Sequence, residues 1–110
     1  MAWLLRNGDV LAAIEDRRRG WPATLQGALI LRPPSLIHTF GCPSALDLAV
    51  CSHATLDTGD RGFAVRRITS VNAHRLRAPL LLGGVVVAAP AGSFERWRLQ
   101  VGDQLEIRAG

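Results

Sequence analysis

Short apolar runs alternate with clusters of turn-forming residues along the chain, and this pattern predicts a sheet-rich fold. Most runs are too short for ordinary helices, and several alternate between apolar and polar positions, as strands with one buried face do. A chain of 110 residues is the size of one domain. We therefore expect a single α+β domain over residues 1–110, with a curled or barrel-like, mainly antiparallel sheet of roughly six to eight strands and one or two short helices.

The segment Ser35–Cys51 is predicted to fold as a central hairpin. Its two apolar halves, Ser35–Phe40 and Leu46–Cys51, are separated by five residues that include Gly and Pro, and such a spacer favours an antiparallel turn. In the simplest register, alternation places one set of side chains on the core face of the sheet: Leu36, His38, Phe40, Leu46, Leu48 and Val50.

Asp47 would lie on the opposite face of this hairpin, across from Thr39. Two interpretations are open. Asp47 could orient a ligand or act as an acid or base, or it could accept hydrogen bonds from the turn and lock it. We favour the structural alternative for Asp47, and a hydrogen-bonded core role for His38 on the apolar face. If the hairpin binds a ligand, the candidate residues are His38, Thr39, Cys42 and Asp47.

The flanking strands follow from the same pattern. Asn7-Gly8 between two apolar runs is a strong signal for a two-residue hairpin turn. Arginines within Phe63–Val71 indicate an edge strand, where charge discourages pairing between sheets, whereas the apolar residues Val85–Ala88 indicate a central strand. The strands expected are Trp3–Arg6, Val10–Ala13, Gly27–Arg32, Phe63–Val71, Leu80–Ala89 and Gln104–Arg108.

Two short helical segments and one exposed turn are also expected. Ile14–Gly20 ends in three arginines and a glycine, which suit the C-terminal end of a helix. Phe94–Leu99 follows Ser93, a favourable N-cap residue. Asp57–Asp60 contains the Asp, Thr and Gly residues that are typical of a turn.

Charge adds a possible binding surface to this picture. The net charge is +4, and every basic side chain other than histidine is arginine. Acidic partners are therefore feasible, and we expect a protein or a small anionic ligand rather than nucleic acid, because no strand carries the aromatic residues that stack on bases. The longest apolar run reaches about half of the ~20 residues that span a membrane. The candidate anion-binding residues are Arg66, Arg67, His74, Arg75 and Arg77.

The chain lacks the spacings that chemistry usually needs. Its histidines and cysteines show no close-pair zinc pattern, and neither a Walker loop nor a dinucleotide fingerprint is present. We therefore predict no cofactor and no metal. Cys42 and Cys51 lie at different levels of the predicted hairpin, too far apart for a disulfide. Together with the absence of a signal-peptide pattern in the sequence, this predicts free thiols and a cytoplasmic location.

Three segments of the chain resemble the bacterial domain-of-unknown-function 192 family: LQGALILRPPSLIHTFG, ALDLAV and AAPAGSFERWRLQVGDQLEI. The resemblance covers Ala12–Ile107, and it departs from the family pattern at Cys42 for Met, Ala45 for Pro and Arg98 for Gly. The matched positions are Arg19, Gly20, Trp21, His38, Thr39, Phe40, Gly41, Leu46, Asp47, Ala91, Gly92, Leu99, Gly102 and Asp103. The resemblance implies a compact β-rich fold with short helices and no known activity.

The function predicted from the sequence is a non-enzymatic binding or interaction module. Two alternatives stay open: a small metal-dependent or Cys/His enzyme built on the hairpin residues, and a basic module that binds nucleic acid through the arginine-rich surface.

Overall fold

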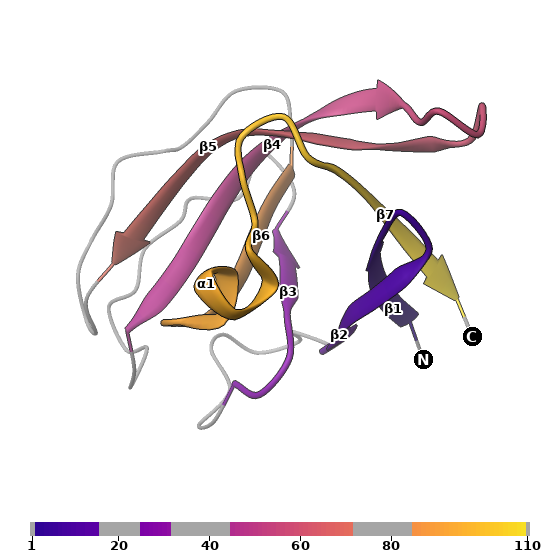
Figure 1. Cartoon of the computed structure of the whole chain (residues 1–110). Helices are drawn as coiled ribbons and strands as arrows, with labels where there is room; N and C mark the ends of the chain where they lie inside the picture. Colours follow the sequence, from indigo (N-terminus) through magenta and orange to yellow (C-terminus); the bar gives the residue numbers. More distant parts are fainter. Residues whose placement is uncertain (1, 16–24, 32–44, 72–84, 110) are drawn as a thin grey trace.

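Seven strands and one short helix make up the part of the chain that the computed structural model describes, which comprises residues 2–15, 25–31, 45–71 and 85–109 (Figure 1). In chain order the elements are β1 (Ala2–Arg6), β2 (Asp9–Ile14), β3 (Leu29–Leu31), β4 (Leu46–Thr55), β5 (Arg61–Val71), β6 (Val85–Pro90), α1 (Ser93–Trp97) and β7 (Gln104–Ala109).

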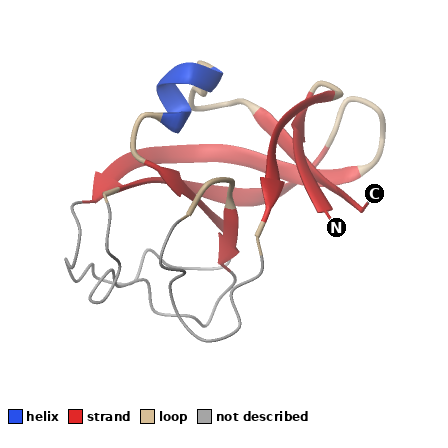
Figure 2. Cartoon of the chain, turned by 90° about the horizontal axis from the view of Figure 1, so that it is seen from below, coloured by secondary structure: helices blue, strands red, loops and turns tan. Residues whose placement is uncertain are grey.

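The strands form one antiparallel sheet that curls into a nearly closed barrel. Their order is β2-β1-β7-β5-β4-β6-β3. The first and last strands of this order meet at a single parallel bridge between Ile14 and Ala28. Main-chain hydrogen bonds support the bridge: the Glu15 N–H donates to the Ala28 oxygen at 2.8 Å, and the Ala28 N–H donates to the Ala13 oxygen at 2.9 Å. Figures 1 and 2 show the sheet wrapping around its core, with α1 lying over one opening. The predicted fold class is confirmed.

The β1–β2 hairpin forms as its turn residues predict. Asn7 and Gly8 both have positive φ, at 53° and 83°. A two-residue turn with both residues left-handed matches the twist of the strands that it joins. Asn tolerates this conformation better than other side chains, and Gly has no Cβ to oppose it.

The core consists of two apolar clusters, because β4 and β6 are buried on both faces. The interior cluster of the barrel includes Ala49, Cys51 and Val87. The alternate residues Leu48 and Val86 belong to a second cluster on the outer face. The expectation that only the face with Leu46, Leu48 and Val50 belongs to the core is therefore wrong, because the opposite face is buried as well. Strands that are buried on both faces show continuous apolar runs, and alternation cannot identify one core face for them.

The predicted pairing of residues 35–40 with residues 46–51 is also wrong. Both edges of this part of β4 are occupied, since Asp47 pairs with Ser70 of β5 on one side and with Ala89 of β6 on the other. Residues 35–40 lie outside the described part of the chain. The hairpin that does form joins β4 to β5 through the predicted turn at residues 57–60. That turn contains Gly59 with φ of 91°, the type of position that favours glycine.

Two smaller expectations need correction. Ile14 belongs to β2, so a helix does not begin there, and residues 16–20 lie outside the described part of the chain. β5 is not an edge strand over its first half, because it lies between β4 and β7. β7 pairs with it at Phe63 and Ala64.

Candidate functional site

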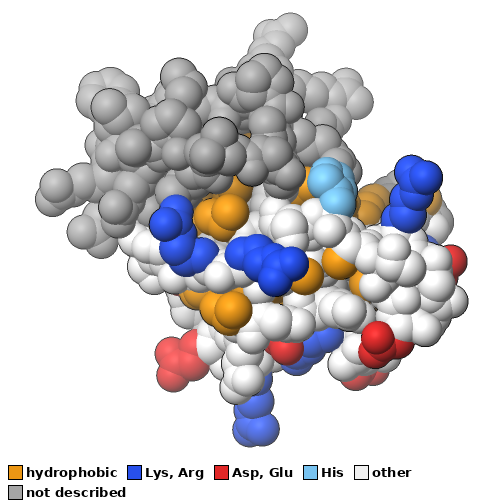
Figure 3. Space-filling model, turned by 90° about the horizontal axis from the view of Figure 1, so that it is seen from above, with side chains coloured by type: hydrophobic (Ala, Val, Ile, Leu, Met, Phe, Trp, Pro, Cys, Tyr) orange, Lys and Arg blue, Asp and Glu red, His pale blue; other side chains and the backbone are white. Residues whose placement is uncertain are grey.

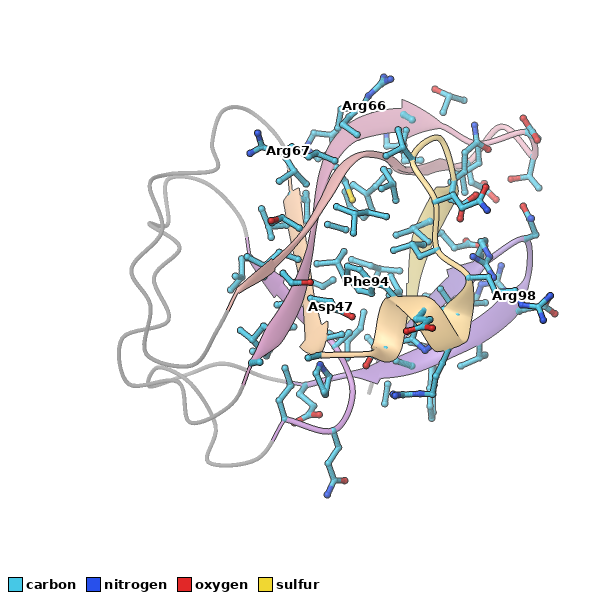
Figure 4. The ribbon with its side chains drawn as sticks, turned by 60° about the vertical axis from the view of Figure 1, so that its left-hand side comes forward. Asp47, Arg66, Arg67, Phe94 and Arg98 are labelled. Carbon is cyan, nitrogen blue, oxygen red and sulfur yellow. The ribbon has the colours of Figure 1, made fainter. Side chains whose placement is uncertain are left out.

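Asp47 is a buried carboxylate that joins the sheet to helix α1. Its exposed fraction is 8%. The Ser70 hydroxyl donates to its Oδ1 atom at 3.3 Å. The main-chain N–H groups of Gly92 and Phe94 donate to its Oδ2 atom at 3.0 and 3.1 Å. Figure 4 shows the Asp47 side chain pointing from the sheet toward Phe94. Asp47 therefore binds groups of β5 and of the start of α1, whereas most of the turn that it was expected to lock, residues 41–44, lies outside the described residues.

The N-terminal end of α1 depends on this carboxylate. The N-cap residue is Gly92, in the left-handed conformation with φ of 92°, and it has no side chain that could cap the helix. Ser93, the cap predicted from the sequence, is instead the first helical residue. Its buried Oγ atom accepts a hydrogen bond from Arg96 at 3.1 Å. Because a negative charge is favourable at a helix N-terminus, Asp47 supplies both the acceptor and the charge that an N-cap usually gives.

The C-terminal end of α1 closes in a Schellman motif. The Leu99 N–H donates to the Phe94 oxygen at 2.9 Å, and the Arg98 N–H donates to the Glu95 oxygen at 3.0 Å. Arg98 has φ of 54° and ψ of 41°, the left-handed position that most helices fill with glycine. Phe94 and Leu99 are both buried in the interior cluster, which is the hydrophobic contact that accompanies this motif.

Arg6 of β1 binds the carbonyl groups that this motif leaves exposed. Its Nη2 atom donates to the Trp97 oxygen at 2.5 Å, and its Nη1 atom donates to the Arg98 oxygen at 3.3 Å. Nη1 also lies 3.1 Å from Oδ2 of Asp103, which in turn accepts the Gln100 N–H at 2.9 Å. The five-residue helix is thus held by an anion at its N-terminus and a cation at its C-terminus, as the helix dipole favours.

The predicted ligand-binding residues are not brought together by the described structure. His38, Thr39 and Cys42 lie outside the described residues. Asp47 is described, but its carboxylate is buried and already accepts three hydrogen bonds. This occupancy leaves it poorly placed to act on a ligand as an acid or base.

Arg66 and Arg67, two of the predicted anion-binding residues, lie side by side on the outside of the barrel. Val50 of β4 pairs with Arg67, and Cys51 pairs with Val65, so Arg66 is the extra residue of a β-bulge. A bulge interrupts the alternation of side chains, and both arginines are consequently exposed. Figure 4 shows both pointing away from the interior. His74, Arg75 and Arg77 lie outside the described residues.

The two guanidinium groups differ in their partners. Arg66 Nε donates to the Ser52 hydroxyl at 2.8 Å, which fixes its direction. Within the described part of the chain, neither Arg66 nor Arg67 forms an ion pair. In Figure 3 basic side chains lie in the middle of this face and also at its lower and right-hand edges, and acidic side chains lie toward the lower and right-hand edges. We call Ser52, Arg66 and Arg67 the bulge surface.

A hollow of about 630 Å³ lies between β5 and helix α1. Ile68 and Ser70 of β5 form part of one wall, and Arg98 and Gln100 form part of the other. Sequence reasoning missed this hollow, since its walls come from segments far apart in the chain. The bulge surface, in contrast, had one available signal: two consecutive arginines interrupt the apolar alternation of β5, as a β-bulge does.

Cys51 is a free thiol inside the barrel. Burial raises its pKa from 9.0 to about 12, because the thiolate would lose its hydration there. A protonated, enclosed thiol is a poor nucleophile. The described residues hold no group of three or more His, Cys, Asp or Glu side chains arranged for a metal. They also contain no helix with the length and apolar character needed to cross a bilayer.

Comparison with known proteins found no match: no protein-family model, curated protein or solved structure is similar enough to the chain to be significant.

Proposed function

We propose that the protein is a non-enzymatic binding module that recognises an anionic group through the bulge surface. The observation that carries this proposal is the β-bulge, which directs Arg66 and Arg67 outward from adjacent positions. Neighbouring guanidinium groups can bind one carboxylate or phosphate through several charge-assisted hydrogen bonds. The Ser52 hydroxyl holds Arg66 in one direction, which lowers the entropy lost on binding.

The arrangement of the acidic residues supports a binding role over an enzymatic one. Asp47, the candidate acid or base among the described residues, is committed to the start of α1. Asp103 is likewise committed to Arg6 and the Gln100 N–H. The arginines of the bulge surface, in contrast, have no acidic partner in the described structure, so their charge is available to a ligand.

The test is a titration of the whole chain with inorganic phosphate, followed by NMR of the arginine side chains and main-chain amides. A double variant, Arg66→Gln with Arg67→Gln, removes the bulge surface. Its matched control, Arg61→Gln with Arg108→Gln, removes the same charge from exposed positions elsewhere. We expect the first variant to weaken binding at least about tenfold and the control to change it by less than about twofold. Equal losses in both would show that only net charge matters, and would overturn the proposal.

We also propose that the chain belongs to the domain-of-unknown-function 192 family. Two positions of the resemblance, Asp47 and Gly92, are joined by a hydrogen bond. Arg98 stands where that family has glycine, and its φ of 54° is the kind of backbone conformation that favours glycine. A cytoplasmic setting is part of the same proposal, and the free thiol of Cys51 is compatible with it.

A further inference from the structure

We propose that a second site, a small hollow between the tips of two hairpins, binds an organic cation that carries a short alkyl chain. Alkyl guanidinium ions belong to this class, either as free molecules or as the end of an arginine side chain. The two tips are the turns at residues 7–8 and 57–60, and Figures 1 and 2 show both on the side of the molecule where β7 runs. The inference goes beyond the bulge surface, because the two sites share no residue and take ligands of opposite charge.

The floor of this turn hollow, which has a volume of about 220 Å³, comes from the outer face of the barrel. Leu4 pairs with Ile107, and both pack in the interior cluster. Side chains alternate along a strand, so the next pair, Leu5 and Glu106, points outward. Both of these residues line the turn hollow, and Leu5 is only 3% exposed although it lies on the outer face. The floor is therefore apolar at Leu5 and charged at Glu106.

The β4–β5 turn forms another wall, which is held in place by its own main chain. The Leu56 N–H donates to the Asp60 oxygen at 2.7 Å, and the Gly59 N–H donates to the Leu56 oxygen at 2.8 Å. A Cβ atom at Gly62 would collide with the Leu56 side chain and with the Leu105 oxygen, so glycine at this position lets the turn approach β7. Leu56 thus adds a second apolar side chain to a preformed site, which lowers the entropy lost on binding.

Three polar side chains in the turn hollow have free hydrogen-bonding groups. Asn7, Asp57 and Gln104 line it, and their side chains form no hydrogen bond with any other described residue. They come from the first turn, the second turn and β7. The two amide groups each offer one acceptor oxygen, and the carboxylate offers two. A ligand with several N–H donors can therefore bind all three segments at once.

The charges of the turn hollow favour a cation. Glu106 pairs with Arg108 at 2.9 Å, so these two charges offset each other. Asp57 supplies the remaining charge, and a carboxylate binds a guanidinium group through two parallel hydrogen bonds. An alkyl chain attached to that group would lie against Leu5 and Leu56. Sites for drug-sized ligands are commonly about 300–1,000 Å³, so the occupant of this smaller space is a small molecule or a single side chain.

The experiment titrates the whole chain with four probes and follows the side-chain amide signals of Asn7 and Gln104 by NMR. The expected ligand is n-butylguanidinium, and n-butylurea is its uncharged counterpart of nearly the same shape. The guanidinium ion without an alkyl chain tests the contribution of the apolar floor. A tripeptide with blocked ends, in which arginine stands between two glycines, tests an arginine side chain as the occupant.

We expect n-butylguanidinium to shift the signals of Asn7 and Gln104 and to leave those of Arg66 and Arg67 unchanged. Butylurea should bind at least about tenfold more weakly, because it lacks the charge, and the bare guanidinium ion should bind severalfold more weakly. Binding of the tripeptide as tightly as n-butylguanidinium would identify the occupant as an arginine of a partner protein. Binding of n-butylguanidinium alone would identify it as a free small cation.

Two variants should change the affinity for n-butylguanidinium in opposite directions. Asp57→Asn should weaken binding at least about tenfold. Its matched control is Asp9→Asn, which removes an exposed carboxylate beside the other turn that does not line the turn hollow, and should change binding by less than about twofold. Arg108→Gln should strengthen binding severalfold, because it releases the charge of Glu106.

The proposal is overturned if n-butylurea binds as tightly as n-butylguanidinium, or if Asp57→Asn and Asp9→Asn weaken binding equally. The dispersion of the main-chain amide signals shows that each variant is folded. Phosphate binding at the bulge surface should be the same in the parent and in Asp57→Asn, so the two proposals are tested separately.

Discussion

Asp47 accepts a hydrogen bond from the main-chain N–H of Phe94, which lies 47 residues further along the chain, at 3.1 Å. A carboxylate in the middle of a sheet therefore does for α1 what a neighbouring cap residue does for most helices. The consequence is that a helix of five residues, too short to persist alone, is fixed by tertiary contacts at both ends.

Replacing Asp47 tests this coupling directly. In Asp47→Ala, the Gly92 and Phe94 N–H groups lose their acceptor in a buried place, and we expect unfolding to become easier by about 2–4 kcal/mol. Asp47→Asn keeps one acceptor oxygen but loses the charge, and should cost about 1 kcal/mol. Denaturant unfolding measures both. Asp57→Asn, at an exposed turn, serves as the control and should change stability by less than about 0.5 kcal/mol.

Arg6 should matter for its geometry as much as for its charge. Arg6→Ala removes the donors to Trp97 and Arg98, and we expect a loss of about 1–3 kcal/mol. Arg6→Lys should recover less than half of this loss, because an ammonium group cannot reach several acceptors in one plane.

Arg108 provides the control for Arg6. It pairs with Glu106 at 2.9 Å, but its side chain is 58% exposed. Arg108→Ala should therefore cost no more than about 0.5 kcal/mol. Thermal unfolding of both variants would contradict the account if Arg108→Ala proved as damaging as Arg6→Ala.

Arg98→Gly is expected to stabilise the protein. The backbone at Arg98 is left-handed, with φ of 54°, which costs a residue with a Cβ roughly 1 kcal/mol. Glycine removes that cost but gains freedom in the unfolded chain, so the net gain should be about 0.5–1 kcal/mol. Glu95→Gly, inside the same helix, should instead destabilise by about 1 kcal/mol. Calorimetry showing the same sign for both would refute this prediction.

Burial of Cys51 makes the free energy of unfolding depend on pH in a range where few other groups titrate. The sequence contains neither Lys nor Tyr. In a Cys42→Ser background, Cys51 of the unfolded chain is therefore the side chain that loses its proton between pH 9 and 11. Folding raises its pKa from 9.0 to about 12, and the folded state therefore keeps the proton longer. The associated stability is complete below pH 9 and is lost as the pH rises toward 12, by roughly 1 kcal/mol per pH unit.

Guanidinium unfolding at several pH values measures this slope. A Cys51→Ala variant in the same background should be less stable at neutral pH because it leaves a cavity, but its stability should vary little between pH 9 and 11. A slope as steep as that of the parent would assign the effect to another group.

Local signals in the sequence predicted the parts of the fold that depend on neighbouring residues. Asn7-Gly8 fixed the first hairpin, and the turn at residues 57–60 fixed the β4–β5 connection. The central strand around Val87 was also evident, because a strand buried on both faces is apolar throughout. The barrel-like class followed from these repeated short strands.

The partners of each strand could not be predicted in the same way. β4 pairs with β5 and β6, and the decision between these and the segment preceding β4 depends on contacts across the whole chain. The role of Asp47 was expected to be structural, but its partners at Gly92 and Phe94 lie beyond any local rule. The direction of Arg67 depends on a bulge whose position is set by the register with β4.

The pairing of β1 with β7 joins the two ends of the described chain, since Ala2 is the partner of Ala109. During synthesis on the ribosome, β1 and β2 therefore emerge long before the strand that anchors them to the rest of the sheet. Until then the β1–β2 hairpin lacks its neighbour on the β1 side, and a two-stranded hairpin alone is marginally stable in water. Emergence of β7 from the exit tunnel is then the event that allows β1 to join the rest of the sheet, and truncation within β7 should leave nascent chains that bind chaperones.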